Sequence, residues 1–143
     1  MIGGLVALKV DPNIMAKLAG QRMSMIVTGT NGKSTTTRMA ANALRTAYTV
    51  ATNDGGDNMD AGIVSALNQD LDADAICLEV DEMHVPHVMD ALSPTVLVLL
   101  NLSRDQLDRV GEINTIERRL REAVAAHPDP VSYTHLRAHE TRG

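Results

Sequence analysis

The sequence contains no Phe, no Trp and only two Tyr among 143 residues, so aromatic side chains supply little of any core. Leu, Ile, Val, Ala and eight Met must fill the interior, and a hydrophobic content of 44% is enough for one compact domain. Basic residues are also few, because 13 Lys and Arg face 18 Asp and Glu, which gives a net charge of −5. This balance argues against a nucleic-acid backbone as the main partner, since such partners select basic surfaces.

Cysteine is nearly absent as well. The single Cys77 lies inside an apolar run, which excludes an intrachain disulfide and favours a reducing compartment. No basic residue adjoins Cys77 in the sequence, so a buried structural thiol is a better interpretation than a nucleophile. Long hydrophobic runs are missing too: the apolar stretch 2–8 is too short to span a bilayer, and no basic region precedes it. We therefore expect a cytoplasmic protein.

Short apolar runs alternate with segments of helical periodicity along the chain. The expected strands are 23–27, 48–52, 75–80 and 95–101, and the expected helices are 11–20, 33–46, 58–68, 83–92 and 113–127. Asp11 followed by Pro12 is predicted to start the first helix, and Gly20 to end it. Continuous apolar strands indicate burial on both faces, so the predicted fold class is α/β, a doubly wound parallel sheet with ligands at the carboxyl ends of its strands.

The character of the sequence changes near its end. Residues 1–130 are predicted to form one nucleotide-binding domain that is incomplete. Residues 131–143, VSYTHLRAHETRG, have no apolar periodicity and no evident place in a sheet. This segment resembles sequencing-adapter read-through, so we expect a non-native or disordered tail and exclude it from reasoning about the fold.

Two pairs of histidines have spacings that suit one helix face. His84 and His87 are three residues apart, but the intervening Pro86 and the lack of nearby cysteines favour a surface position or the rim of a site. His135 and His139 are four apart in the tail, and without a third ligand a metal pair is the less favoured interpretation.

The segment TGTNGKS, residues 28–34, follows the first predicted strand and precedes a predicted helix. A phosphate-binding loop needs glycines so that backbone N–H groups point inward, a lysine to neutralise the β and γ phosphates, and a hydroxyl to bind Mg²⁺. Gly29, Gly32, Lys33 and Ser34 supply these groups. The partial positive charge at the start of the following helix adds to the site.

The strict phosphate-loop pattern requires a glycine where this chain has Val27. A glycine four residues before the lysine, T-G-T-N-G-K-[ST], is instead the version in Mur ligases and folylpolyglutamate synthases, which the chain resembles at every position. The resemblance implies the P-loop NTPase-like central domain of a Mur ligase, with Lys33 as catalytic residue. The implied ATP-binding residues are Gly29, Thr30, Asn31, Gly32, Lys33, Ser34 and Thr35. A chance glycine-rich turn is disfavoured, because strand, loop, lysine, hydroxyl and helix occur in the right order.

Acidic residues follow the third predicted strand, where a carboxylate can reach a metal ion held by the loop hydroxyl. Mur ligases carry a Mg²⁺-binding glutamate after the corresponding strand, so the resemblance implies Ser34 and Glu79 as metal ligands. Asp81 and Glu82 are equally well explained as acids that complement the dipole of the next helix.

The segment 101–109, NLSRDQLDR, follows the fourth predicted strand and therefore lies on the same rim. Mur ligases typically show N-x-x-x-D-H-x-D here, with the histidine as a second metal ligand. Gln106 replaces that histidine, which leaves a second Mg²⁺ site open. R-D-Q-L-D-R, together with residues 8–13, resembles the members of the family that amidate lipid II. A solvated charged turn is the alternative for these charged residues.

The resemblance covers about residues 5–125 and implies an ATP-dependent ligase that phosphorylates the α-carboxylate of D-glutamate in the lipid II stem peptide. Ammonia from a glutaminase subunit then displaces the phosphate from the acyl phosphate. Mur ligases continue into a C-terminal domain, so we expect this fragment to be inactive alone. The residues themselves establish only Mg²⁺–nucleotide binding. Alternatives are a folylpolyglutamate synthase-like or other Mur-type ligase, a small-molecule kinase or other phosphate-loop NTPase, and a non-catalytic nucleotide-binding remnant.

Overall fold

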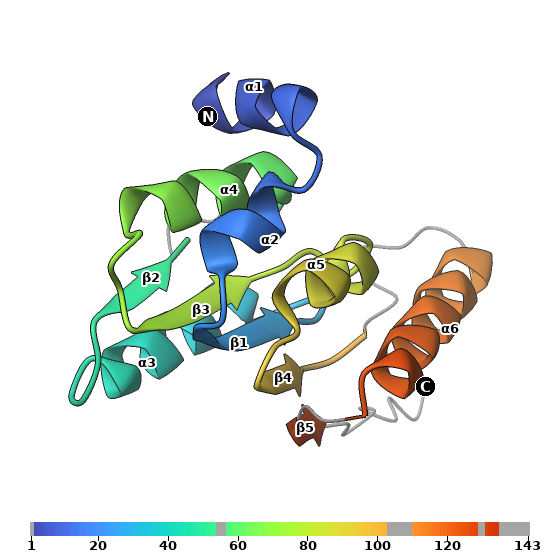
Figure 1. The fold of residues 1–143 in the computed structure, drawn as a ribbon. Helices are drawn as coiled ribbons and strands as arrows, with labels where there is room; N and C mark the ends of the chain where they lie inside the picture. Colours follow the sequence, from blue (N-terminus) through green and yellow to red (C-terminus); the bar gives the residue numbers. More distant parts are fainter. Residues whose placement is uncertain (1, 54–56, 103–109, 129–130, 135–143) are drawn as a thin grey trace.

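Five parallel strands form a single sheet in the computed structural model, which describes residues 2–53, 57–102, 110–128 and 131–134. The strands are β1 (Met23–Thr28), β2 (Val50–Thr52), β3 (Ala75–Glu79), β4 (Val96–Leu99) and β5 (Val131–Thr134). Their order is β2-β3-β1-β4-β5, so β1 is central and β3 lies between β1 and β2 (Figure 1). The predicted parallel α/β sheet is confirmed.

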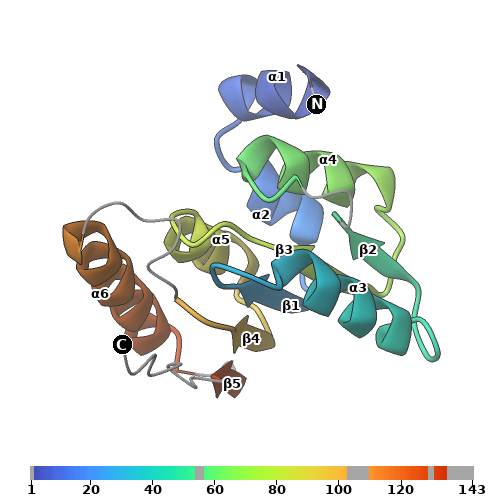
Figure 2. The ribbon, with the colours of Figure 1, turned by 180° about the vertical axis from the view of Figure 1, so that it is seen from behind.

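Helices cover both faces of the sheet. On one face lies α3 (Lys33–Leu44), seen in front of the strands in Figure 2. The other face is covered by α2 (Ile14–Ala19), α4 (Asp60–Gln69), α5 (Val85–Leu92) and α6 (Val110–Ala126). Outside these, α1 (Ile2–Val10) packs on α4 (Figure 1). Among the described residues, no helix combines the length and apolar character needed to cross a membrane.

The residues of β3 show why this strand was visible in the sequence as an uninterrupted apolar run. All five are buried, because their side chains alternate between two covered faces. Ile76 and Leu78 enter the large core beneath α2, α4 and α5, whereas Ala75 and Cys77 enter a smaller core beneath α3. Burial raises the pKa of the Cys77 thiol to about 11, which agrees with a structural thiol rather than a nucleophile.

The predicted start of the first helix is wrong in two respects. Residues 2–10 form α1, which the sequence did not predict, and α2 begins only at Ile14. Asp11 does not cap a helix that starts with Pro12. Its carboxylate instead accepts a hydrogen bond of 3.0 Å from the N–H of Asn13, which stabilises a turn between the two helices. The predicted end is confirmed, since α2 stops at Gly20 with φ of +58°.

The expectation that residues 131–143 have no place in the sheet is wrong for β5. Val131–Thr134 pair in parallel with β4, with Val131 opposite Val96 and Thr134 opposite Leu99. An edge strand pairs through backbone groups and does not need the apolar periodicity that the sequence lacks here. The non-native origin of the segment stays a prediction, and residues 135–143, with both tail histidines, lie outside the described part.

Candidate functional site

The carboxyl ends of β1, β3 and β4 meet at one edge of the sheet. Val27 lies opposite Glu79 on one side and opposite Val98 on the other, so the three neighbouring strands end at the same level. The loop of residues 29–32 leaves β1 at this edge and enters α3 at Lys33. Parallel topology therefore brings together segments that are far apart in the sequence.

Two glycines allow the loop to take its path. Gly29 has φ of +141°, and a Cβ there would lie 2.7 Å from the Cβ of Leu100 and 3.1 Å from the carbonyl oxygen of Asn101. Gly32 has φ of +87° and forms the left-handed N-cap of α3. Both conformations are strained for residues with a side chain, so glycine is required by the backbone and, at Gly29, also by packing.

Asn101 fixes the loop against the end of β4. Its carbonyl oxygen accepts a hydrogen bond of 2.7 Å from the N–H of Thr30, and its side-chain oxygen accepts one of 3.1 Å from the N–H of Asn31. The amides available to a phosphate include those of the first turn of α3, Lys33 to Thr35, which have no carbonyl partners within the helix. The sequence placed Asn101 on the rim but did not predict this function.

The two predicted metal ligands are in contact. The hydroxyl of Ser34 lies 3.0 and 2.9 Å from the two carboxylate oxygens of Glu79, and Glu79 is only 3% exposed. A hydroxyl and a carboxylate offer the hard oxygen atoms that Mg²⁺ prefers. The predicted pair is thus brought together at the end of β3, although 45 residues separate its members.

Asn53 and Asn58 are site residues that the sequence analysis missed. The side chain of Asn53 accepts from the N–H of Glu79 and donates to its carbonyl oxygen, both at 2.8 Å, so it holds the backbone on both sides. A third bond, of 2.7 Å, joins the Asn53 side-chain amide to the carbonyl of Asp57. Asn58 donates at 3.4 Å to the Glu79 carboxylate. The signal available in the sequence was a polar residue placed directly after a buried strand.

Lys33 is held by neighbours of opposite polarity. Its ammonium group donates to the carbonyl oxygens of Gly29 and Thr30 and lies 3.1 Å from the carboxylate of Glu82. Both side chains of this ion pair are mostly buried, with 12% and 13% exposed. Burial raises the pKa of Glu82, and the charge of Lys33 opposes the rise. Glu82 is therefore more than a helix-start acid: it neutralises the loop lysine.

A polar cavity of about 230 Å³ lies over the loop. It is lined by Thr30, Asn31, Gly32, Lys33, Ser34, Thr35, Asn58 and Glu79. Every predicted nucleotide and metal residue lines it except Gly29, which forms the base of the loop. A second cavity, of about 240 Å³, lies between α1, α2 and α4, and its mostly apolar lining offers no comparable phosphate-binding groups.

Two further groups of predicted residues are not part of the described cavity lining. Gln106 and the charged residues around it lie in 103–109, outside the described residues. His84 and His87 are described, and they lie at the start of α5, beyond the cavity lining.

Comparison with known proteins places these motifs in a family. Residues 27–134 match the family described as the Mur ligase middle domain. The chain is 36% identical over 130 residues to the lipid II isoglutaminyl synthase (glutamine-hydrolyzing) subunit MurT of Streptococcus pneumoniae, which covers 87% of this chain and 29% of that protein. The MurT subunit of Staphylococcus aureus is 36% identical over 126 residues, covering 85% and 29%. The chain thus spans less than a third of the length of these relatives.

Solved structures agree with this result. The MurF ligase of Thermotoga maritima in complex with ADP superposes with a TM-score of 0.73 at 25% identity, over 87% of this chain and 31% of that one. MurF of Acinetobacter baumannii superposes with a TM-score of 0.72 at 21% identity, over 90% and 30%, which supports the fold alone.

Proposed function

The chain belongs to the Mur ligase family, and on that premise we propose that it carries the ATP-binding part of a ligase that joins a carboxylate to an amine or to ammonia. The observation that carries the proposal is the contact between Ser34 and Glu79 beside the glycine loop. A hydroxyl at a helix start and a buried carboxylate at the end of the neighbouring strand β3 form the donor pair that a nucleotide-bound Mg²⁺ requires.

The described residues fit a magnesium nucleotide. The oxygen donors of Ser34 and Glu79 lie side by side, and the glycine at position 29 lets the backbone run close to the end of β4. The cavity above the loop is lined by polar groups. Mg²⁺ held there would neutralise phosphate charge and align the terminal phosphoryl group.

Each group has a distinct function in this proposal. Lys33 and the amides at the start of α3 bind the β and γ phosphates and stabilise the charge that develops on the transferred phosphoryl group. Ser34 and Glu79 hold the ion, while Asn53 and Asn58 orient Glu79. A carboxylate substrate is itself the nucleophile, so this part of the chain needs no general base.

The finer proposal concerns the substrate. The likeness to MurT subunits supports a ligase that acts on the α-carboxylate of D-glutamate in the lipid II stem peptide, in the cytoplasm. The carboxylate attacks the γ phosphorus of ATP, ADP leaves, and an acyl phosphate forms. Ammonia from a glutaminase partner then attacks the acyl carbon and phosphate leaves. This chain spans 29% of the length of the MurT relatives. In a protein of their length, the other residues would supply the remaining substrate contacts.

The nucleotide site is tested by calorimetry with Mg²⁺–ATP on the full chain. We expect Lys33→Ala to abolish detectable binding, because the phosphates lose their main cationic partner. Lys17→Ala is the matched control, since Lys17 is exposed on α2 and its side chain contacts only Asp11 among the contacts identified in the described residues. Unchanged affinity in Lys33→Ala would remove the loop from the proposal.

The reaction is tested with the gene of full family length, expressed with its glutaminase partner. Lipid II, glutamine and Mg²⁺–ATP should yield ADP, phosphate and an amidated stem peptide, detected by mass spectrometry. An amino acid joined in place of ammonia would indicate another Mur-type or folylpolyglutamate-like ligase. A stable phosphorylated product would indicate a kinase, and binding without turnover would indicate a remnant.

A further inference from the structure

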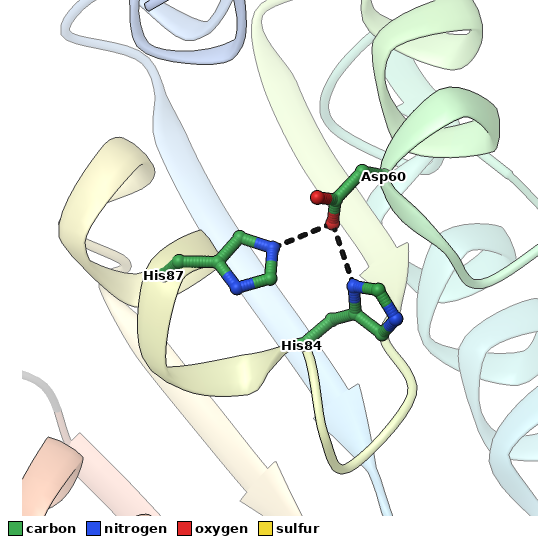
Figure 3. A group of neighbouring side chains, drawn as sticks. All are labelled: Asp60, His84 and His87. Atoms are coloured by element: carbon green, nitrogen blue, oxygen red, sulfur yellow. Dashed lines mark hydrogen bonds and ion pairs between the residues drawn. The ribbon is translucent and has the colours of Figure 1, made fainter. Parts of the chain in front are cut away.

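Three potential metal ligands converge beside the candidate nucleotide site (Figure 3). Nδ1 of His84 lies 2.9 Å from Oδ1 of Asp60, and Nε2 of His87 lies 2.6 Å from the same oxygen. The three ligand atoms all lie within 4.8 Å of one another. The two imidazole planes meet at 71° and are not stacked, and one nitrogen of each ring faces the carboxylate (Figure 3).

The backbone holds these side chains in place. Asp60 is the first residue of α4, and His84 is the N-cap of α5, whose first turn contains Pro86. The N–H of Asp81 donates to the carbonyl of Asn58 at 3.0 Å and thereby ties the segment before α4 to the segment before α5. The carbonyl of Asp81 in turn accepts from the N–H of His84 at 2.9 Å. The two halves of the cluster are therefore fixed to each other without any ion.

We propose that Asp60, His84 and His87 bind a divalent transition-metal ion of the Zn²⁺ class. Ligand atoms about 2.0–2.2 Å from a tetrahedral zinc ion lie about 3.3–3.5 Å from one another, so only small side-chain movements separate this geometry from a metal site. Two imidazoles and one carboxylate suit Zn²⁺, Co²⁺ or Ni²⁺ and not Mg²⁺, which prefers oxygen donors. Three protein ligands leave at least one coordination position for water.

Proton accounting distinguishes this cluster from an ordinary surface ion pair. Without an ion, a carboxylate at Asp60 can only accept, so both imidazoles would have to donate an N–H to the same oxygen. A metal ion replaces both protons and lets all three groups act as lone-pair donors. The pair of His127 and Asp90, at 2.8 Å, shows the simpler arrangement with one imidazole and one carboxylate.

The site is accessible to an ion from solution, because the side chain of His87 is 49% exposed. It also lies near the nucleotide cavity without sharing its lining residues. Asn58, which lines the cavity, is two positions before Asp60, and Glu82, which pairs with Lys33, is two positions before His84. The metal proposal therefore does not depend on ATP binding.

The test is Co²⁺ titration of the full, tag-free chain, followed by its visible absorption and by competition with Zn²⁺. We expect one Co²⁺ to bind with a d–d spectrum and to be displaced by Zn²⁺. Loss of an outer-shell partner alone weakens metal sites about 10- to 100-fold, so His87→Ala and Asp60→Asn should each weaken binding at least about tenfold. Asp60→Asn keeps the shape and a hydrogen-bond acceptor but removes the charge.

Two controls separate this cluster from the other histidines. His127→Ala should leave the affinity unchanged, and so should His135→Ala combined with His139→Ala. Circular dichroism without metal should show that His87→Ala melts like the parent, because this side chain is half exposed. The proposal is overturned if the parent binds no Co²⁺, if His87→Ala binds it as tightly as the parent, or if only the tail variant loses binding.

Discussion

The end of β3 and the segment directly after it are held in different ways. Glu79 ends the strand, is almost fully buried, and is fixed through both backbone groups by the side chain of Asn53. In residues 81–87 the contacts run between side chains that are more exposed than Glu79: Glu82 pairs with Lys33, and His84 and His87 both contact Asp60. The first region is held through hydrogen bonds to its backbone, and the second through contacts between side chains. The two kinds of contact lie within nine residues of chain, from Glu79 to His87.

Asn53→Ala, which removes the hydrogen bonds that hold the backbone of Glu79, should have the largest effect. It leaves the N–H and carbonyl of Glu79 and the carbonyl of Asp57 without their partner, and each buried unsatisfied group costs about 1–3 kcal/mol. We expect the free energy of unfolding to fall by about 3 kcal/mol. Urea denaturation measures this free energy. Under conditions where Asn53→Ala is still folded, its Mg²⁺-dependent affinity for ATP should also be lower than that of the parent.

The matched control is Asn42→Ala, since Asn42 is exposed on α3 and its side chain bonds only to Arg45 among the contacts identified in the described residues. We expect the free energy of unfolding of Asn42→Ala to stay within about 0.5 kcal/mol of the parent value. Equal effects of the two asparagine variants would contradict the assignment of Asn53 as the residue that positions Glu79.

Gly29→Ala extends the same comparison to the loop. The new Cβ would meet the Cβ of Leu100 at 2.7 Å while the backbone keeps φ of +141°, so we expect a loss of about 1–3 kcal/mol in the free energy of unfolding. Thermal unfolding measures the change. Gly3→Ala, in α1 with open space around its Cβ position, should be neutral or slightly stabilising. A fully tolerated Gly29→Ala would show that the loop can move away from β4.

Glu82→Gln tests whether the negative charge of Glu82 changes the affinity of the loop for ATP. Removing a negative charge next to Lys33 should strengthen Mg²⁺–ATP binding by about 1 kcal/mol, or about fivefold, because the carboxylate competes with phosphate for the ammonium group. Calorimetry against the parent gives the ratio. Weaker binding in the variant would mean that Glu82 orients Lys33 productively and does not compete with phosphate.

The pH dependence of stability should show the smallest effect. Burial raises the pKa of Glu82 above its ordinary value of 4.5, so the folded state binds this proton more tightly than the unfolded state. The contribution to the free energy of unfolding is therefore fully present below pH 4.5 and is lost as the pH rises through the raised pKa. Urea denaturation across this interval should show a steeper decline for the parent than for Glu82→Gln. If the free energies of unfolding of the two proteins changed in parallel with pH, burial would not raise the pKa of Glu82.

The strands and the phosphate loop were predictable because their signals are local. A continuous apolar run marks a strand covered on both faces, and glycines, lysine and hydroxyl in order mark a loop before a helix. The errors arose where local signals compete. Asp11 has the composition of a helix cap but stabilises a turn, and β5 pairs through its backbone without an apolar pattern. Asn53 was missed as a site residue, and the function of Asn101 was missed, because their partners are 26 and about 70 residues away.

The sequence by itself determined the parallel α/β class, the loop and the chemical identity of its lysine and hydroxyl, since these depend on residue type and on neighbours a few positions away. The tertiary structure decided which distant groups meet them. Ser34 contacts Glu79, and Lys33 contacts Glu82, because β3 lies beside β1 in the sheet. Asp60 meets His84 and His87 because α4 and the α5 segment start at the same edge. Strand order fixes these contacts, and no local pattern encodes strand order.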